Sequence, residues 1–239
     1  MRRVVLVTGS TSGIGEATAR YFAQRGDVVV FNSVTSVEAG ERLVAATPDS
    51  YYVQGDVKDS ADCERLVRSV LERSGRLDVL VNNAGTTHVI DHRDLAAASV
   101  EVWREIFEVN VFGTWQLSVA AMDALRQSHG AIVNVSSVAG VRATGSSIPY
   151  AASKAALNHM TQLLAKSVGP EVRVNAVAPG LIDTPWTQDW DAVRSAVSAR
   201  APLRRSGKPD DVADVIYLLA TTSYVTGEVV LVDGGLNLG

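Results

Sequence analysis

The chain has 239 residues, of which 46% are hydrophobic and 20% charged, a composition typical of globular proteins. Its formal net charge of -4 gives no basic surface of the kind that binds nucleic acid, so we expect no nucleic-acid partner. No stretch approaches the ~18 uninterrupted apolar residues of a membrane span, so we expect no membrane partner either.

The N-terminal residues MRRVVLVTGS resemble a signal peptide only in their two arginines. Their apolar run is about five residues long, shorter than the ~7–15 of a signal peptide's hydrophobic region, and it stops at a glycine turn. The one cysteine, Cys63, excludes an internal disulfide framework and fits a reducing compartment. We therefore expect a cytoplasmic protein whose structure begins close to residue 1.

Short apolar runs rich in β-branched residues alternate with longer segments of helical spacing. Most of the runs are continuous, which is typical of strands buried on both faces. The alternation predicts an α/β fold: a doubly wound parallel sheet of about seven strands with helices on both faces. The predicted strands are 4–8, 28–31, 51–54, 78–83, 131–137, 172–179 and 228–235.

No linker, repeat or block of charge divides the chain, so we expect a single domain over 1–239. The least regular stretch is 181–206, which follows a Pro-Gly pair and contains Trp186 and Trp190. We expect this stretch to be partly helical and to cover a substrate at the carboxyl edge of the sheet. The two tryptophans are candidates for an apolar pocket wall, although packing explains them equally well.

A glycine-rich turn joins the first predicted strand to the first predicted helix. Gly9, Gly13 and Gly15 permit a tight turn and let the backbone approach a pyrophosphate, to which the helix N-terminus offers N–H donors. The alternative is a merely flexible loop. The position directly after a strand favours dinucleotide binding, with the spacing T-G-x-x-x-G-x-G rather than G-x-G-x-x-G.

A second pattern opens the helix predicted to start near Pro149. Tyr150 and Lys154 stand four residues apart, so they lie on one face of that helix, one turn apart. A lysine ammonium favours the phenolate and lowers the pKa of the tyrosine. Such a tyrosine can exchange a proton with a carbonyl or alcohol oxygen. For an isolated Y-x-x-x-K pair, a core aromatic beside a solvated lysine is the better interpretation.

Taken together, the spaced motifs resemble the short-chain dehydrogenase/reductase family nearly from end to end. The general pattern is similar to bacterial 3-oxoacyl-carrier-protein reductases, without a feature that fixes that substrate. The resemblance implies a Rossmann fold and an NAD(P)(H)-dependent oxidoreductase that interconverts a carbonyl and a secondary alcohol. The motifs are the glycine turn from Thr8 to Gly15, NNAG at 82–85, Asn110, NVSS at 134–137, Tyr150 with Lys154, and Pro-Gly at 179–180.

The resemblance implies four catalytic residues: Asn110, Ser137, Tyr150 and Lys154. Ser137, 13 residues before Tyr150, would polarise the substrate oxygen that Tyr150 protonates. Ser136 is the competing candidate. Asn110 would support a local kink in a long helix over 101–126 and a water linked to Lys154, which would also hold the ribose of the nicotinamide.

The resemblance also implies a set of cofactor contacts along the chain. Asp56 and Val57 would grip the adenine ring, with a surface turn as the alternative for Asp56, and Ile182 and Thr184 would contact the carboxamide. The full set is Gly9, Ser12, Gly13, Ile14, Gly15, Ser33, Asp56, Val57, Asn83, Ala84, Gly85, Tyr150, Lys154, Pro179, Gly180, Ile182 and Thr184.

The end of the second predicted strand bears on the choice between the two nicotinamide cofactors. An acidic residue there binds the adenosine ribose diol and favours NAD, whereas a nearby arginine favours NADP. Residues 32–36 contain neither, and Ser33, Thr35 and Ser36 supply hydroxyl donors. We expect NADP(H) to be preferred over NAD(H), with use of both left open.

The remaining expectations concern metals, assembly and rival functions. His88, His92 and His129 show no metal-ligand spacing, so we expect no metal. The helices over 101–126 and from Tyr150 carry more apolar residues than one sheet face needs, which predicts a homotetramer or homodimer. Rival functions are reduction of a conjugated double bond, epimerisation of a sugar, and a non-catalytic dinucleotide-binding redox sensor.

Overall fold

The computed structural model describes residues 2–238. Its centre is a seven-stranded sheet in the order β3-β2-β1-β4-β5-β6-β7, in which every neighbouring pair is parallel. All seven predicted strands are confirmed, with ends shifted by a few residues. The strands are β1 Val4–Val7, β2 Val28–Ser33, β3 Ser50–Gln54, β4 Val79–Asn82, β5 Ala131–Val135, β6 Arg173–Pro179 and β7 Val229–Val232.

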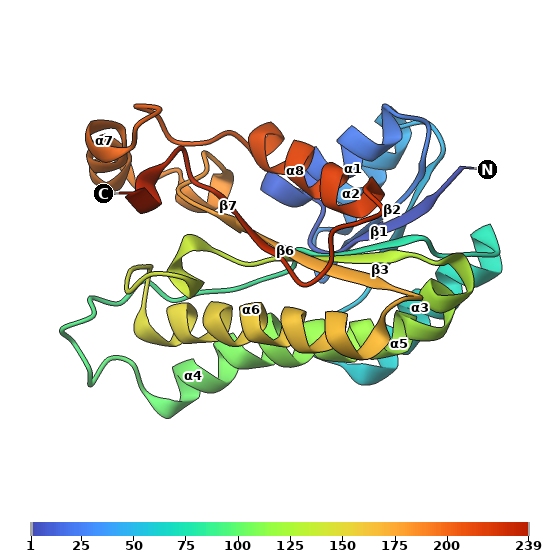
Figure 1. Cartoon of the computed structure of the whole chain (residues 1–239), viewed down its shortest axis with the longest axis horizontal. Coiled ribbons are helices and arrows are strands. Elements are labelled where there is room, and N and C mark those ends of the chain that lie inside the picture. The colour runs from blue at the N-terminus through green and yellow to red at the C-terminus, as the bar shows by residue number, and fades with distance from the viewer. Residues whose placement is uncertain (1, 239) are drawn as a thin grey trace.

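Helices cover both faces of this sheet (Figure 1), as the alternating pattern predicts. One face carries α1 Gly13–Ala23, α2 Val37–Ala46 and α8 Pro209–Thr221; the other carries α3 Ser60–Ser74, α4 Val100–Phe107, α5 Thr114–Ser128 and α6 Ile148–Val168. The sequence thus specifies a doubly wound α/β fold, because each strand offers an apolar side chain to both layers of helices.

The strands show how this double burial works. Along β1, Leu6 packs into the core beneath α3, α5 and α6, whereas Val5 and Val7 pack beneath α1 and α8. Successive strand residues point to opposite faces, so a continuous apolar run fills two cores at once. Leu6 and Val5 are fully buried, and truncating such a leucine to alanine costs about 2–5 kcal/mol.

The sheet order reverses beside β1, and this reversal positions the functional site. β2 lies on one side of β1 and β4 on the other, so the connections that leave these strands run to opposite sides. A crevice opens at such a point outside the carboxyl ends of the strands, where open α/β folds bind ligands.

The stretch 181–206 is partly helical, as predicted. It contains a short 3-10 turn, η3 Pro185–Thr187, and α7 Asp191–Arg200, which Figure 1 places beyond one end of the sheet. Arg194 fastens the stretch by ion pairs to Asp183 at 2.8 Å and Asp191 at 2.6 Å. A second short turn, η2 Val138–Gly140, follows β5, and a third, η4 Leu236–Leu238, follows β7.

Candidate active site

A single large cavity of about 1220 Å³ opens at the carboxyl ends of the strands. It brings together nearly all of the predicted site residues, although they come from seven separate segments of the chain. Only Gly15 and Asn110 of the predicted set do not line it. Those that do are Gly9, Ser12, Gly13, Ile14, Ser33, Asp56, Val57, Asn83, Ala84, Gly85, Ser137, Tyr150, Lys154, Pro179, Gly180, Ile182 and Thr184.

The backbone of the glycine turn adopts conformations and close contacts that require glycine. Gly9 and Gly13 have φ angles of +58° and +56°, in the left-handed region that glycine adopts at no steric cost. A Cβ on Gly15 would lie 2.5 Å from both the Gly9 carbonyl oxygen and Asn83 Nδ2. Gly15 therefore serves close packing of helix against loop, which explains why it stands behind the cavity wall rather than in it.

The loop after β4 locks onto this turn through polar side chains. Thr8 Oγ1 accepts hydrogen bonds at 3.0 Å from the backbone N–H groups of Asn83 and Ala84. Asn83 Nδ2 in turn donates to the carbonyls of Thr8 and Gly9 at 2.8 and 3.1 Å. These bonds fix the two loops against each other and leave the backbone of Gly85 free to form cavity wall.

At the far end of the cavity, Asn32 joins three strand ends. Its Nδ2 donates to the carbonyls of Val53 and Gly55, both at 3.1 Å, and its Oδ1 accepts from Gly9 N at 3.4 Å. Ser33 follows, with its hydroxyl 2.9 Å from the hydroxyl of Tyr52. Neither residue brings a negative charge to this end of the cavity.

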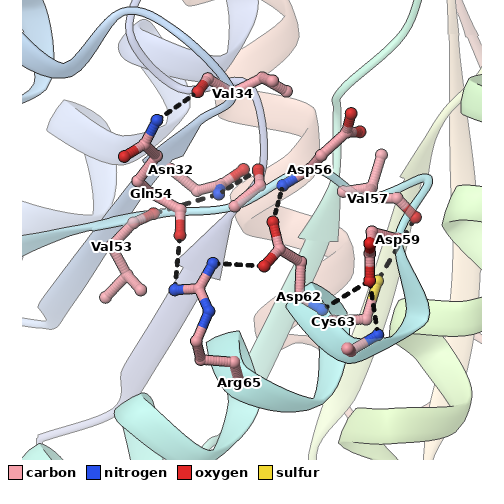
Figure 2. A network of polar contacts seen from close by, with 12 residues as sticks. Asn32, Val34, Val53, Gln54, Asp56, Val57, Asp59, Asp62, Cys63 and Arg65 are labelled. Carbon is pink, nitrogen blue, oxygen red and sulfur yellow. Dashed lines mark hydrogen bonds and ion pairs between the residues drawn. The ribbon is translucent and has the colours of Figure 1, made fainter.

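The turn after β3 is held by a network of carboxylates, drawn in Figure 2. Asp62 accepts from the backbone N–H of Asp56 at 2.9 Å, and Arg65 ties Asp62 to the carbonyl of Gln54. The Asp56 amide and the Arg65 guanidinium hold the pKa of Asp62 below its usual value. Asp56 is half-buried and lines the cavity.

Ser137 and Tyr150 both line the cavity. Ser137 follows β5, and its side chain accepts from Ala139 N at 3.2 Å. Tyr150 lies in the first turn of α6, which Ser147 caps by accepting from Tyr150 N at 3.3 Å. Ser136 is directed elsewhere: its hydroxyl donates to the carbonyl of Lys154 at 3.3 Å.

Lys154 lies one turn further along α6 and is almost fully buried, with 4% of its surface exposed. Its ammonium donates to the carbonyl of Val135 at 2.9 Å and stands 5.7 Å from the centroid of the Tyr150 ring. Removal from water lowers the pKa of Lys154 to about 8, because burial disfavours the charged form.

The direction of the Tyr150 pKa differs from the sequence-based expectation. Lysine was expected to lower it, whereas burial of the phenol is the largest effect and raises it; the hydrogen bond from Ser137 acts in the opposite direction. The reason is geometric: Lys154 binds a backbone carbonyl rather than the phenolic oxygen. The protein chain by itself therefore favours a protonated Tyr150.

Asn110 sits in a π-helix, η1 Glu108–Gly113, that interrupts the predicted long helix between α4 and α5. Where we expected a kink at Asn110, the structure has this wider π-helical turn. Its Oδ1 accepts from Thr86 N at 2.8 Å, and its Nδ2 donates to Thr86 O and Ser153 Oγ, both at 3.0 Å. A Cβ on Gly85 would lie 3.3 Å from Asn110 Oδ1 and 3.7 Å from Lys154 Nζ, so the three residues adjoin.

The remaining predicted contacts follow β6. Gly180 N donates to the carbonyl of Val232 at 3.0 Å, and a Cβ there would lie 3.0 Å from Asp233. Thr184 caps η3, and its methyl group would be 3.3 Å from a Cβ on Gly13. The stretch after β6 thus reaches back to the glycine turn and closes the cavity between them.

Several lining residues were not named individually as site residues from the sequence. They are Asn32, Thr87, His92 and Ser146; Thr87 and His92 belong to the 86–95 loop, on which, together with 181–206, we expect the substrate class to depend. The position of Asn32 at the end of a predicted strand was the one usable signal. No group of three or more potential metal-ligating side chains occurs among residues 2–238, and no helix in that range has the length and apolarity to cross a membrane.

The residues of this cavity fit a nicotinamide dinucleotide. The glycine turn presents backbone N–H groups at the start of α1, and Gly9 and Gly13 have the backbone that close approach requires. Gly13 and Gly85 line the cavity, and a Cβ on either would lie 3.3 Å from a neighbouring side chain, that of Thr184 or Asn110. The cradle therefore extends from the turn after β3 to Tyr150.

Comparisons with known proteins agree with this geometry. A family model described as enoyl-(acyl carrier protein) reductase matches residues 9–237. The chain is 56% identical over 239 residues to a Streptomyces violaceoruber protein named as ketoacyl reductase 2 of granaticin polyketide synthase, which covers 98% of this chain and 96% of that one. It is 42% identical over 249 residues to a 3-oxoacyl-[acyl-carrier-protein] reductase of Thermotoga maritima, with 98% and 97% covered.

Solved structures share the whole fold. A structure from Burkholderia xenovorans described as a short-chain dehydrogenase/reductase superposes with a TM-score of 0.94 at 38% identity, covering 100% of this chain and 99% of that one. ElxO with NADP bound gives a TM-score of 0.92 at 30% identity, with 100% of both chains covered. From its motifs, its fold and these relatives, the chain belongs to the short-chain dehydrogenase/reductase family of NAD(P)-dependent carbonyl and alcohol oxidoreductases.

Proposed function

We propose that the protein is an NADP(H)-preferring ketone reductase in which Tyr150 is the general acid and base. The observation that carries this proposal is that Ser137, Tyr150 and Lys154 line the same cavity as the glycine turn. The ammonium of Lys154 stands 5.7 Å from the centroid of the Tyr150 ring. Two hydroxyls in one cavity suit a single oxygen atom that changes between carbonyl and alcohol.

The proton transfer follows from these positions. Ser137 donates a hydrogen bond to the carbonyl oxygen and polarises it, and Tyr150 delivers its proton to that oxygen as the carbonyl is reduced. The bound nicotinamide supplies the hydride. A raised pKa keeps the Tyr150 phenol protonated at neutral pH, which suits the direction of reduction. The buried charge of Lys154 then stabilises the phenolate that remains.

The preference for NADP(H) rests on the end of β2. Asn32 is committed to backbone carbonyls, and Ser33 presents a hydroxyl where a carboxylate would repel a 2′-phosphate. Comparing saturation by NADPH and NADH tests the preference, with Ser33→Asp alongside. We expect Ser33→Asp to weaken NADPH binding at least ~10-fold with little effect on NADH. Stronger use of NADH by the wild-type enzyme would overturn the preference.

For the substrate, we propose a 3-oxoacyl thioester or a similar polyketide ketone, because the 56% identical relative is named as a ketoacyl reductase. The family model is described by an enoyl reductase, so double-bond reduction is the second candidate. A screen of NADPH oxidation with 3-oxoacyl and enoyl thioesters of equal chain length separates the two. Turnover of the enoyl thioester alone would replace the proposal.

Tyr150→Phe is the decisive variant. It keeps the ring and removes only the hydroxyl, so we expect turnover to fall by ~10²–10⁴-fold while NADPH binds nearly as before. Stopped-flow reduction and fluorescence titration of NADPH measure the two quantities. A variant that keeps most of its activity would show that Tyr150 is not the acid. A wild-type protein that binds NADPH but reduces no ketone would favour the redox-sensor alternative.

We further propose that the chain is one domain, works in the cytoplasm and forms a homotetramer or homodimer. Support for assembly comes from α5, where Phe112, Trp115 and Val119 lie at helical spacing around its start and are about half exposed. Leu163 on α6 is exposed as well. Light scattering coupled to size exclusion tests the assembly, and a monomer at micromolar concentration would contradict it.

A further inference from the structure

The loop between β4 and α4 contains an imidazole nitrogen that lacks a partner. His92 lines the cavity, and its Nε2 is buried without a hydrogen-bond partner among residues 2–238. Leaving a buried donor or acceptor unpaired costs about 1–3 kcal/mol. Such atoms are uncommon in folded proteins, and each requires an explanation.

A tight turn directs His92 toward the protein. Asp94 N donates to the carbonyl of Asp91 at 2.9 Å, which closes the turn. Arg93 forms an ion pair with Asp91 at 3.1 Å, and both side chains are exposed, whereas His92 between them is half-buried. The charged pair therefore remains in water while the imidazole is turned away from it.

The same loop is anchored beside the catalytic tyrosine. Ile90 N donates to the carbonyl of Ser146 at 2.8 Å, and the hydroxyls of Thr87 and Ser146 lie 2.6 Å apart. Next to Ser146, a Cβ on Gly145 would lie 3.6 Å from Cδ1 of Tyr150. The loop that carries His92 is thus fixed to the segment that packs against the Tyr150 ring.

Two neighbouring polar side chains of the loop, those of Thr87 and His88, are already paired. Thr87 and Ser146 satisfy each other, and His88 forms a 2.8 Å contact with Glu105 outside the cavity. Around them, Trp186 and Val193 supply apolar lining. His92 Nε2 is a buried polar atom of this loop without a partner, and rotation of the imidazole ring would let a polar atom of a bound molecule pair with it.

We propose that His92 recognises the substrate, donating a hydrogen bond to a second oxygen atom distinct from the one that Tyr150 protonates. This inference rests on the proposed ketone reductase activity. A 3-oxoacyl thioester has such an atom, the thioester carbonyl oxygen, which only accepts hydrogen bonds and so pairs with an imidazole N–H. A polar site of this kind rejects analogues that lack the second oxygen far better than an apolar pocket does.

The test compares two substrates that differ at one atom. One is a 3-oxohexanoyl thioester of N-acetylcysteamine, and the other is the matching thioether in which a methylene replaces the thioester carbonyl. His92→Phe keeps a ring of similar size without a donor, and His92→Gln restores an amide donor. His88→Phe is the matched control, because His88 lies on the same loop and pairs outside the cavity.

We expect His92→Phe to lower kcat/KM for the thioester by at least ~10-fold and to leave the thioether within about twofold. His92→Gln should recover most of the loss, and His88→Phe should resemble wild type. If His92→Phe lowers kcat/KM equally for the thioester and the thioether, or lowers it for neither, the proposed role of His92 is wrong. NADPH titration shows whether the variants keep an intact cofactor region. If the wild-type enzyme reduces neither compound, the proposed function fails first and this inference fails with it.

Discussion

The two ends of the cavity, which we propose hold the cofactor and the substrate and call the cofactor end and the substrate end, are built in different ways. The cofactor end is formed by the buried ends of β1, β2 and β4, where Asn32 and Asn83 each bind two backbone carbonyls. The substrate end is formed by the 86–95 loop and the 181–206 stretch, which hold largely exposed side chains such as Trp186. Rigid strand ends suit a ligand of constant shape, whereas surface loops accommodate ligands that vary.

The difference also appears in how each end is fastened. Main-chain atoms of the cofactor end are tied to one another through buried polar groups, which are costly to disturb. At the substrate end, Arg194 and its partners Asp183 and Asp191 are fastened by ion pairs near the surface. Exposed ion pairs contribute only about 0–1 kcal/mol each. We therefore expect mutations at the two ends to separate cofactor binding from substrate binding.

The largest effect is expected at Gly15. In Gly15→Ala the new Cβ would stand 2.5 Å from the Gly9 carbonyl oxygen, so the turn and the start of α1 must move apart. We expect the NADPH dissociation constant to rise at least ~10-fold, with a loss of stability of about 1–3 kcal/mol. Isothermal titration and urea unfolding measure these changes. Gly26→Asn is the control, because no atom lies within 4 Å of a Cβ there. An unchanged NADPH affinity in Gly15→Ala would contradict the idea that the cofactor end is rigid.

Lys154 stands where the two ends meet, and its effect should depend on pH. Its pKa falls from 10.5 to about 8 on folding, so the folded protein releases the proton at lower pH than the unfolded chain does. Below pH 8, Lys154 is protonated in both the folded and the unfolded state. Above pH 8, the free energy of unfolding of the wild type rises until Lys154 of the unfolded chain also loses its proton near pH 10.5. Relative to Lys154→Met, the free energy of unfolding of the wild type should rise by about 2 kcal/mol between pH 7.5 and pH 10.

Urea unfolding of both proteins at these two pH values measures that difference. The raised pKa of Tyr150 is present in both proteins, so its contribution cancels. Parallel pH dependence of wild type and Lys154→Met would mean that Lys154 is solvated, and the boundary between the two ends would then be open to water.

The smallest effect is expected at Arg194. Arg194→Ala removes two ion pairs and a 3.1 Å bond to the carbonyl of Thr187, which loosens the 181–206 stretch. We expect KM for the ketone to rise about threefold, with kcat and the NADPH dissociation constant within about twofold. Arg42→Ala, which removes an exposed pair with Glu38, is the control. An equal rise in the NADPH dissociation constant would show that the two ends are coupled.

Much of this architecture could be predicted from the sequence. Continuous apolar runs such as VVLV identify strands buried on both faces, and β1 has that sequence and that burial. The glycine turn was predictable because glycine is the residue that its backbone requires at Gly9 and Gly13. Local sequence determines these features, so no knowledge of the three-dimensional contacts was needed.

Other features depend on contacts between distant segments. The direction of the Tyr150 pKa depends on burial and on Lys154 binding the carbonyl of Val135, neither of which the four-residue spacing reveals. His92 and Ser146 belong to loops whose sequences carry no periodic signal, and they enter the cavity through the pairing of Ile90 with Ser146. The substrate end is therefore the part that sequence alone describes least well.

The π-helix at Glu108–Gly113 has a consequence for insertions and deletions. An α-helix turns about 100° per residue, so one residue added within this segment and wound as α-helix would rotate the whole of α5 by that angle relative to α4. Trp115 and Val119 would leave the surface strip they now share, and Leu117 and Leu125 would leave the core. Asn110 would at the same time lose its alignment with Thr86 and Ser153. A one-residue change of length thus alters packing, outer surface and active site together, so the length of this segment is under tighter constraint than most of its side chains.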